Sequence, residues 1–474
     1  MTAENSSLKT RATKALNDDS LQQALSVIGT GFVQKRAKAV AACPDFQALS
    51  DRGVEIKEHA LTHLDHYLTE FETALKATGG HLHFANTPQE ARKIISDICH
   101  QQNAKLVAKG KTMVGEEIDL THHLTDQGFE CVETDLGEYL IQLRDEMPSH
   151  IIAPAVHLSR DTIAQDFKEA HTSLAQDRLL EKPEDLVKEA RVIMREKFLK
   201  ADVGITGANL LIAETGTSVI VTNEGNGDLV SSLPKTHIVI SSFDKVVPTF
   251  EDASVILRLL ARSATGQAIS TYTTFTTGPK RASDQDGPSN FHVVLLDNGR
   301  SKMLGSQFQE MLRCIRCGAC LNHCPVYQNL GGHAYGSVYP GPMGTVLSPQ
   351  FMGKQSQDLP FASSFCGRCN EICPMQIPLT KLMRFWRQEA AKDHGWLEKI
   401  SMKGWAALAK RPWLYNAMLK LSLPVLAWTT KQKALTKHIP MLKAWGQHRT
   451  VPALAPQSFQ SLYKASQNKK KQSQ

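Results

Sequence analysis

Seven of the ten cysteines stand between residues 314 and 373, in two short motifs. The first motif is C-x2-C-x2-C-x3-C-P, with the sequence Cys314-Ile-Arg-Cys317-Gly-Ala-Cys320-Leu-Asn-His-Cys324-Pro325. In two-cluster ferredoxins this run gives three thiolates to one iron–sulfur cluster, and the fourth reaches the other cluster. The spacing therefore predicts iron–sulfur clusters. Because only the fourth cysteine reaches the second cluster, that cluster requires further ligands from a second motif.

The second motif also ends in Cys-Pro and has the sequence Cys366-Gly-Arg-Cys369-Asn-Glu-Ile-Cys373-Pro374, with Ser363 where a full motif would place its first cysteine. The crossed ligand rule assigns Cys314, Cys317, Cys320 and Cys373 to cluster 1, and Cys324, Cys366 and Cys369 to cluster 2. We expect two [4Fe–4S] clusters, the second with a non-cysteine fourth ligand. A Ser363 oxygen, a water, a partner's ligand or a three-iron cluster could each complete cluster 2, and the sequence does not choose among them.

Zinc is the alternative for these cysteines, because C-x2-C also suits tetrahedral zinc. A zinc-stabilised scaffold would then only organise partner proteins. We favour iron–sulfur clusters because C-x2-C-x2-C-x3-C-P is much more selective than a single C-x2-C pair. The remaining cysteines, Cys43, Cys99 and Cys131, have no partner at ligand spacing and are interpreted as ordinary thiols.

The segment from Gly331 to Gly344 connects the two motifs and is rich in glycine and proline. It is predicted to be irregular and to wrap backbone around the clusters, where N–H groups on cluster sulfurs would raise the reduction potential. Its His333 and Tyr335 are interpreted as packing and hydrogen-bonding residues in preference to redox groups.

The sequence divides into four predicted regions. Residues 1–80 are predicted to be helical, with an amphipathic stretch over Val54–Lys76, and residues 81–298 alternate strands with helices, which indicates an α/β sheet domain. Residues 299–394 form the iron–sulfur module and residues 395–474 a separate C-terminal region. The strands predicted within the α/β domain are His81–Ala85, Lys105–Ala108, Ile151–Ala153, Ala208–Ile212, Ser218–Thr222, His237–Ser241, Thr271–Thr276 and His292–Leu296.

Two loops of the α/β domain could bind a ligand. Glu214 and Glu224 lie in Gly- and Thr-rich turns that could present N–H groups to an anion, although glycine-dependent turns with solvent-facing glutamates are the simpler interpretation. The charged stretch from Lys109 to Glu117 follows a strand, where open α/β sheets commonly bind ligands. It lacks P-loop spacing, and no dinucleotide fingerprint follows a strand, so no tightly bound nicotinamide cofactor is expected.

The C-terminal region is strongly basic. From Gly395 to Gln474 there are 14 Lys and Arg residues and one acid, Glu398, and five of the six tryptophans lie there, the sixth being Trp386. We expect it to pack as a small helical unit or to dock on a partner, with at most peripheral membrane contact and no nucleic acid. The stretch from Ser466 to Gln474 is predicted to be disordered.

The amino terminus has no apolar stretch of the kind a signal peptide needs, and no apolar run of about 18 residues occurs in the chain. We expect a cytoplasmic protein, which could also associate peripherally with a membrane. A reducing compartment favours metal binding over disulfides for clustered cysteines.

The two cysteine motifs, within MLRCIRCGACLNHCPVYQNLGGHAYGSVYPGPMGTVLSP and SSFCGRCNEICPMQIPL, resemble those of the lactate utilisation protein B family, the iron–sulfur component of a bacterial system that oxidises L-lactate. The upstream stretches KGKTMVGEEIDLTHHL and GANLLIAETGTSVIVTNEGNGDLVSSLPKTHIVI resemble the lactate-utilisation (LUD) domain of that family, so the likeness covers nearly the whole chain. That family's second motif also has three cysteines.

The resemblance implies a fold: an α/β LUD domain similar to the sugar-phosphate isomerase and CoA-transferase-like class, an α-helical two-cluster ferredoxin module and a helical C-terminal region. It also implies a function, electron transfer in oxidation of L-lactate to pyruvate within a complex with subunits A and C, toward an unidentified electron acceptor. A second hypothesis makes the LUD domain itself the site that binds or oxidises a hydroxyacid, with the clusters as electron acceptors.

Overall fold

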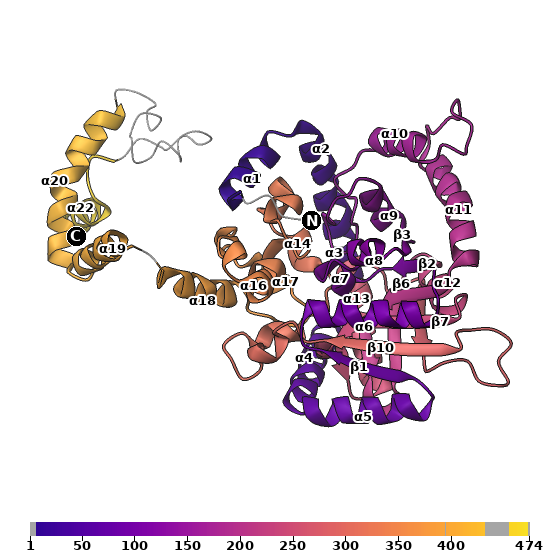
Figure 1. The fold of residues 1–474 in the computed structure, drawn as a ribbon. Coiled ribbons are helices and arrows are strands. Elements are labelled where there is room, and N and C mark those ends of the chain that lie inside the picture. The colour runs from indigo at the N-terminus through magenta and orange to yellow at the C-terminus, as the bar shows by residue number, and fades with distance from the viewer. Residues whose placement is uncertain (1–5, 394, 432–454, 473–474) are drawn as a thin grey trace. The chain divides into compact units, whose positions relative to one another are not determined.

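The computed structural model describes residues 6–393, 395–431 and 455–472, which form two compact units, Met1–Glu389 and Ala390–Gln474 (Figure 1). The first unit opens with five α-helices and a π-helical turn: α1 (Leu8–Leu16), α2 (Asp19–Ile28), η1 (Gly29–Val33), α3 (Gln34–Ala41), α4 (Phe46–Thr62) and α5 (Leu64–Ala77). The amphipathic stretch Val54–Lys76 is helical, as predicted, and a turn at His63 divides it between α4 and α5. The two halves separate because α4 packs into the core of the cysteine-rich region whereas α5 packs on the sheet.

A six-stranded parallel sheet forms the centre of the α/β domain. Its strands lie in the order β1 (His81–Ala85), β10 (Asn290–Leu296), β7 (Thr236–Ser242), β4 (Val203–Gly207), β2 (Leu106–Gly110) and β3 (Glu130–Glu133). All five pairings are parallel. Strands of such a sheet are apolar on both faces. Accordingly, Ile238 and Ile240 of β7 belong to one core and the intervening Val239 to another.

Helices cover both faces of this sheet, as Figure 1 shows for α6 and α5 beside β1 and β10. One face packs against α6 (Pro88–Gln101), α7 (Met113–Glu117) and α8 (Leu120–Asp126). The other face packs against α5, α9 (Leu136–Leu143), α10 (Arg160–Ala170) and α11 (Pro183–Lys200), and α12 (Asn226–Ser232) lies against β4 and β2. Thr87 caps α6 by accepting a hydrogen bond from the Glu90 N–H, and the sequence Thr87-Pro88-Gln89-Glu90, with a capping residue and a first-turn proline, favours a helix that begins here.

A second sheet of four strands lies beside the cysteine-rich region. Its order is β8 (Val246–Val247), β5 (Leu210–Ile212), β6 (Thr217–Thr222) and β9 (Tyr272–Thr276), and helix α13 (Phe250–Ala264) packs on it. Apolar residues of this sheet, of α13, of α4 and of the cysteine motifs share one continuous core.

The strand predicted at Ile151–Ala153 is wrong. These residues form an irregular loop, in which the N–H groups of Ile152 and Ala153 donate to Nδ1 of His150 at 3.0 and 3.2 Å and not to a neighbouring strand. The loop packs instead against the first cysteine motif, because a Cβ on Gly318 would lie 2.9 Å from the Ile152 side chain.

The cysteine-rich region consists of short helices joined by turns. They are α14 (Ala319–Asn322), α15 (Tyr327–Leu330), η6 (His333–Tyr335), α16 (Gly341–Met352), α17 (Arg368–Ile372) and α18 (Leu379–Ala391). The segment from Gly331 to Gly344 was predicted to contain no regular helix, yet α16 begins at Gly341. Proline in the first turn is compatible with an α-helix, and Pro342 occupies the first turn here.

The second unit contains helices α19 (Trp396–Ala409), α20 (Pro412–Lys431) and α22 (Phe459–Gln472). The disorder predicted from Ser466 is wrong for the described residues, because α22 continues to Gln472. Lysine and glutamine are good helix formers, and neither glycine nor proline interrupts this stretch. Among the described helices none is long and apolar enough to span a membrane.

Candidate functional site

The cysteines assigned to cluster 1 meet around one cavity. Cys314, Cys317, Cys320 and Cys373 all line it, and the other lining residues are largely apolar, among them Met311, Met343 and Ile377. Cys373 comes from the second motif, whereas the other three belong to the first. Glycine at 318, with φ of 71°, lets the chain turn from Cys317 into α14 so that Cys320 faces back toward the same cavity.

The three cysteines assigned to cluster 2 form a second group. Cys324 and Cys366 are electrostatic neighbours of Cys369, although they come from different motifs. Cys366 is exposed, whereas Cys324 and Cys369 are buried. The second group therefore lies at the surface of the first unit, with one cysteine open to solvent.

Ser363, the candidate fourth ligand, is partly exposed. Its hydroxyl accepts a hydrogen bond from the Phe365 N–H at 3.1 Å, and its carbonyl accepts one from the Arg387 guanidinium at 3.2 Å. These bonds hold the turn that leads into Cys366. The fourth ligand of cluster 2 stays a prediction.

The buried surroundings of these cysteines fit a cofactor that stabilises the thiolate form of their side chains. Burial, reinforced by the charge of Cys373, raises the pKa of Cys317 to about 12, and burial raises that of Cys373 to about 11. Thiolates at such positions need compensating positive charge, which the iron of a cluster supplies. A single zinc ion fits less well, because tetrahedral Zn–S bonds of about 2.3 Å hold sulfurs only about 3.8 Å apart. Within the described ranges, no three cysteine sulfurs lie within 4.8 Å of one another.

Backbone N–H groups within the first cysteine motif and directly after it face these sulfurs. The sulfur of Cys317 interacts with the N–H of Ala319, and that of Cys324 with the N–H groups of Val326 and Tyr327. These N–H groups are available because each Cys-containing turn leads into a helix, whose first N–H groups have no partner within the helix. That N–H groups of the segment from Gly331 to Gly344 also meet cluster sulfurs stays a prediction.

His333 and Tyr335 fill different roles in the connecting segment. The imidazole of His333 donates from Nε2 to the Met147 carbonyl at 2.7 Å, as expected for a residue that packs and hydrogen-bonds. Tyr335 is 1% exposed, and its hydroxyl has no hydrogen-bond partner among the described residues. That hydroxyl faces Cys324 and Cys320, which belong to the two different cysteine groups.

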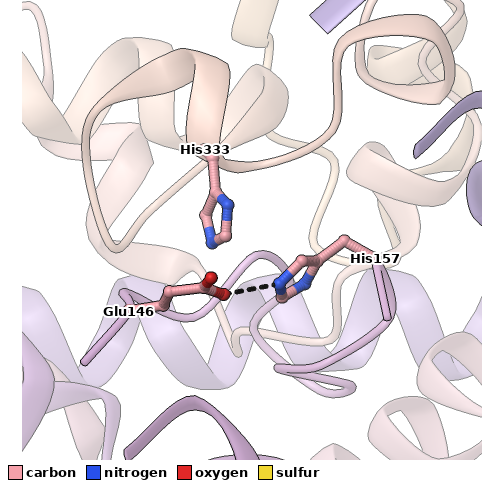
Figure 2. Close-up of side chains that lie close together, drawn as sticks. All are labelled: Glu146, His157 and His333. Carbon is pink, nitrogen blue, oxygen red and sulfur yellow. Dashed lines mark hydrogen bonds and ion pairs between the residues drawn. The ribbon is translucent and has the colours of Figure 1, made fainter. Parts of the chain in front are cut away.

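Figure 2 shows how His333 meets Glu146 and His157 of the α/β domain. Nε2 of His157 donates to Glu146 at 2.8 Å, and Arg144 donates to the other carboxylate oxygen at 3.0 Å. Burial alone would raise the pKa of Glu146, but the bond and charge of His157 together with Arg144 lower it to about 2. Three donor atoms within 4.8 Å of one another could hold a divalent cation. Because Arg144 already neutralises the carboxylate, we interpret the group as a clamp between the domain and the connecting segment.

The N-terminal helices wrap the cysteine motifs, which the sequence reasoning did not detect. Arg36 donates to the carbonyl of Ile372 at 2.8 Å, and Ser50 donates to that of Pro374 at 2.7 Å. Arg11 donates to the Ala334 carbonyl at 2.9 Å. Amphipathic helices give no sequence signal of the partner they cover, so only the tertiary structure reveals these contacts.

The charged stretch after β2 separates into two groups of side chains. Lys109 is fully buried on β2 itself, with Nζ 2.5 Å from Glu116 and 2.6 Å from Glu133. Burial opposes the charge of Lys109, but Glu116 and Glu133 raise its pKa well above the usual value. Burial and the neighbouring Glu133 raise the pKa of Glu138 well above its usual value. Lys109 is therefore part of a buried charge network and not of an open loop.

Lys111 lies at the mouth of a cavity beside the sheet, which we call the sheet-edge cavity. This cavity has a volume of about 160 Å³, and its polar lining residues include Lys111, Asn209, Ser242, Lys245, Arg316 and Tyr339. Three of them follow the carboxyl ends of β2, β4 and β7, and two come from the cysteine-rich region. The cavity therefore joins the α/β domain to the cysteine motifs.

The glutamates of the Gly- and Thr-rich turns are exposed and play structural roles. Glu214 accepts a hydrogen bond from the Phe250 N–H at 2.6 Å, which caps α13, and Glu224 pairs with Lys111 at 2.8 Å. The solvent-facing interpretation is confirmed for both. Among the glycines of these turns, Gly216 has the positive φ, 64°, that a glycine-dependent turn requires, whereas Gly225 has a φ of −73° and does not.

A buried network links the two parts of the first unit, and the sequence reasoning did not anticipate it. The guanidinium of Arg300 pairs with both carboxylate oxygens of Glu117 at 2.9 and 2.5 Å and lies 4.5 Å from the ring centroid of Phe351. Tyr339 donates to the same carboxylate at 2.7 Å. Glu117 belongs to the α/β domain, whereas Tyr339 and Phe351 belong to the cysteine-rich region.

In the C-terminal unit, three tryptophans interleaved with basic residues are exposed. Trp396, Trp405 and Trp413 have 69, 62 and 71% of their surface accessible, which excludes them from a core of the described residues. The side chains of Trp428 and Trp445 lie outside the described residues. Exposed apolar side chains at this density favour an interaction surface over core packing.

Three family models match successive parts of the chain: "LUD domain" at residues 68–296, "4Fe-4S dicluster domain" at 310–377 and "Lactate utilisation protein B, C-terminal" at 386–468. A relative from Lysinibacillus sphaericus (strain C3-41), "Lactate utilization protein B", is 43% identical over 469 residues, 98% of each chain. A relative of the same name from Bacillus subtilis (strain 168) is 42% identical, covering 96% of this chain and 95% of its own. A solved structure of a DUF162 family protein from Deinococcus radiodurans covers 49% of this chain and 98% of its own, at 16% identity and a TM-score of 0.26.

The fold, the cysteine motifs and these matches define an iron–sulfur protein that combines a LUD domain with a 4Fe–4S dicluster domain. Full-length relatives above 40% identity make the assignment more specific. The chain belongs to the lactate utilization protein B family.

Proposed function

We propose that this chain is the electron-transfer subunit of a complex that oxidises L-lactate to pyruvate. The family assignment supports a role in lactate utilisation, and the dicluster domain supports iron–sulfur electron transfer. In this proposal the chain is not a stand-alone enzyme. It acts with subunits A and C of the same system and passes electrons to a further acceptor, from the cytoplasm or from the surface of a membrane.

Two [4Fe–4S] clusters are proposed, each with its own ligand set. Cluster 1 takes Cys314, Cys317, Cys320 and Cys373, and cluster 2 takes Cys324, Cys366 and Cys369 with a non-cysteine fourth ligand. The single observation that carries this assignment is the meeting of Cys373 with the first three cysteines around one cavity. When bound, each such cluster accepts one electron at a time, so oxidation of one lactate requires two transfers.

The positions of the two cysteine groups support a path for these electron transfers from the interior of the protein to its surface. The cysteines of cluster 1 lie in the interior beside the sheet-edge cavity, whereas Cys366 of cluster 2 is exposed. The buried hydroxyl of Tyr335 interacts electrostatically with Cys324 of one group and with Cys320 of the other. The proposed route therefore runs from the interior, past Tyr335, to a partner that docks near Cys366.

The four regions proposed from the sequence, residues 1–80, 81–298, 299–394 and 395–474, have separate tasks in this view. The first shields the cysteine motifs and the second is the LUD domain. The third holds the clusters, and the basic fourth, with its exposed tryptophans, docks on a partner of the complex.

Replacement of Cys373 tests the ligand assignment. Anaerobically purified protein should contain about eight irons and show reducible EPR signals, or about seven irons if cluster 2 is a three-iron cluster. The Cys373→Ala variant should lose the cluster 1 signal although the residue belongs to the second motif. The Cys131→Ala variant is the matched control, because it removes a buried thiol that is not a proposed ligand. An intact cluster 1 in Cys373→Ala, or zinc in place of iron, would overturn the proposal.

The alternative, in which the LUD domain itself binds or oxidises a hydroxyacid with the clusters as electron acceptors, has one observation in its favour. The sheet-edge cavity adjoins the cysteines of cluster 1, since Arg316 lines both the cavity and the cluster site.

A further inference from the structure

The sheet-edge cavity lies where an open α/β sheet is expected to bind a ligand. From β2 the chain passes to β3 on one side and then returns to β4 on the other side of β2. Connections that leave in opposite directions open a crevice at the carboxyl ends of the two strands. Lys111 and Thr112 after β2, and Asn209 after β4, line the cavity at this point.

The lining of the cavity carries more positive charge than the neighbouring carboxylate balances. Lys245 is 7% exposed, and its ammonium forms no hydrogen bond or salt bridge with any residue in the described part of the chain. Arg316 contacts Met343 at 3.9 Å, the ring of Tyr339 and Cys314. The carboxylate of Asp244 lies near both of these cations, Lys245 and Arg316. It also interacts with two further basic residues, Arg300 and Lys57.

Such an excess of buried positive charge is costly, and an anion in the cavity would lower that cost. The other charged residues of the lining do not oppose an anion. Lys111 is already paired with Asp135 at 2.9 Å and with Glu224 at 2.8 Å. Glu138 is the acidic residue among those lining the cavity, and burial raises the pKa of its carboxyl well above the usual value, which disfavours a negative charge there.

The strained backbone conformation of Arg316 also supports an anion site in this cavity. Arg316 has φ of 58°, a conformation that non-glycine residues rarely adopt. Strain of this kind persists where the surrounding structure holds a side chain for a purpose. Here it directs a guanidinium from the first cysteine motif into the wall of the cavity, beside Cys314.

We propose that the sheet-edge cavity binds a small monocarboxylate, a 2-hydroxy acid or its 2-keto acid, with the carboxylate held by Lys245 and Arg316. A volume of about 160 Å³ holds several water molecules or one three-carbon acid. Asn209 and Ser242 offer polar groups for the second oxygen of such a ligand. The inference rests on the proposed function for its choice of acid, and it concerns binding alone.

The rival explanation is that these cations only balance the charge of cluster 1. Lys57 provides the matched control, because it is a buried lysine near Asp244 that donates to the carbonyls of Asp244 and Val246 and does not line the cavity. Ala264 of α13 lines the cavity and carries no charge, so Ala264→Leu reduces the space without changing the electrostatics.

The experiment is anaerobic titration calorimetry of the full-length, cluster-loaded chain with L-lactate, pyruvate and the neutral analogue L-lactamide. We expect saturable binding of the two acids, no binding of the amide, and a loss of affinity of about tenfold or more in Lys245→Met. Lys245→Arg should restore part of the affinity, Ala264→Leu should lose it, and Lys57→Met should stay within about threefold of the parent.

Two results would overturn the inference: no saturable binding by the parent chain, or equal binding by the parent, Lys245→Met and Ala264→Leu. A change of reduction potential in Lys245→Met without a change in affinity would support the rival explanation. If Lys245→Met does not fold, Ala264→Leu decides the question alone. Reducible clusters without acid binding would refute this inference and leave the proposed function standing. Acid binding by a chain that holds no iron would refute the proposed function and leave this inference standing.

Discussion

The buried pair between Arg300 and Glu117 should be a main source of the stability of the first unit. The side chains are 1 and 3% exposed, and the two hydrogen bonds between them are bidentate. In Arg300→Met the carboxylate of Glu117 keeps the bonds from Asn298 and Tyr339 but loses its compensating charge. Breaking a buried pair in this way costs about 3–5 kcal/mol.

This cost can be converted into a change of melting temperature. At about 2.1 cal/mol/K per residue, the 389 residues of Met1–Glu389 have an unfolding entropy of about 0.8 kcal/mol/K. The free-energy loss then lowers the Tm of this unit by about 4–6 °C at neutral pH. The effect should shrink as the pH falls. Arg300 lowers the pKa of Glu117 against the opposing effect of burial, so the pair stabilises the fold above about pH 4.5 and loses that contribution below it.

Anaerobic differential scanning calorimetry at pH 7 and at a pH below about 4.5 measures both effects on the parent, Arg300→Met, Glu117→Gln and the double variant. Since both residues belong to one network, the double variant should lose less stability than the sum of the single variants, by about 0.5–3 kcal/mol. Arg300→Lys is the control that keeps the charge without the bidentate geometry, and its loss should be smaller than that of Arg300→Met.

A Tm within about 1 °C of the parent in Arg300→Met would refute the reasoning. So would strictly additive losses in the double variant, because they would show that the two side chains contribute independently. An unchanged Tm would mean that other contacts between the LUD domain and the cysteine-rich region, such as the bond from His333 to the Met147 carbonyl and the apolar packing, account for their stability.

Three further predictions follow from individual side chains. Tyr335→Phe should lower the reduction potential of at least one cluster without loss of iron, because its buried hydroxyl faces cysteines of both groups, and EPR-monitored potentiometry would detect it. Lys109→Met should cost about 3–5 kcal/mol by leaving buried carboxylates unpaired, whereas Glu138→Gln, which replaces a carboxyl whose negative charge burial disfavours, should stay within about 1 kcal/mol in the same calorimetry. Gly332→Ala should impair cluster loading, because its Cβ would lie 1.8 Å from a backbone oxygen of the LUD domain, while Gly29→Ala, in open space and helical conformation, should be neutral or stabilising by up to about 1 kcal/mol.

Local sequence patterns predicted most of the sheet elements correctly. The strand at His81–Ala85 and the helix that Thr87 caps depend on alternation and on a capping residue, which are properties of neighbouring residues. The strand predicted at Ile151–Ala153 failed for the converse reason. Its apolar residues pack against the first cysteine motif, and the N–H groups of Ile152 and Ala153 donate to the His150 ring. Because these contacts depend on the tertiary structure, no local sequence pattern distinguished this segment from a strand.

The cysteine spacing by itself predicted the class of cofactor, which the match to a 4Fe-4S dicluster domain confirms, and a crossed ligand assignment, which stays a prediction. The charged stretch after β2 was likewise recognised as a possible ligand site, but its lysines could not be told apart. Only the tertiary structure decided that Lys109 is buried in a charge network and that Lys245 and Arg316, which are distant in the sequence, line one cavity. Contacts between distant segments depend on how the sheet, the N-terminal helices and the cysteine motifs pack together, and packing of that kind leaves no periodic signal in the sequence.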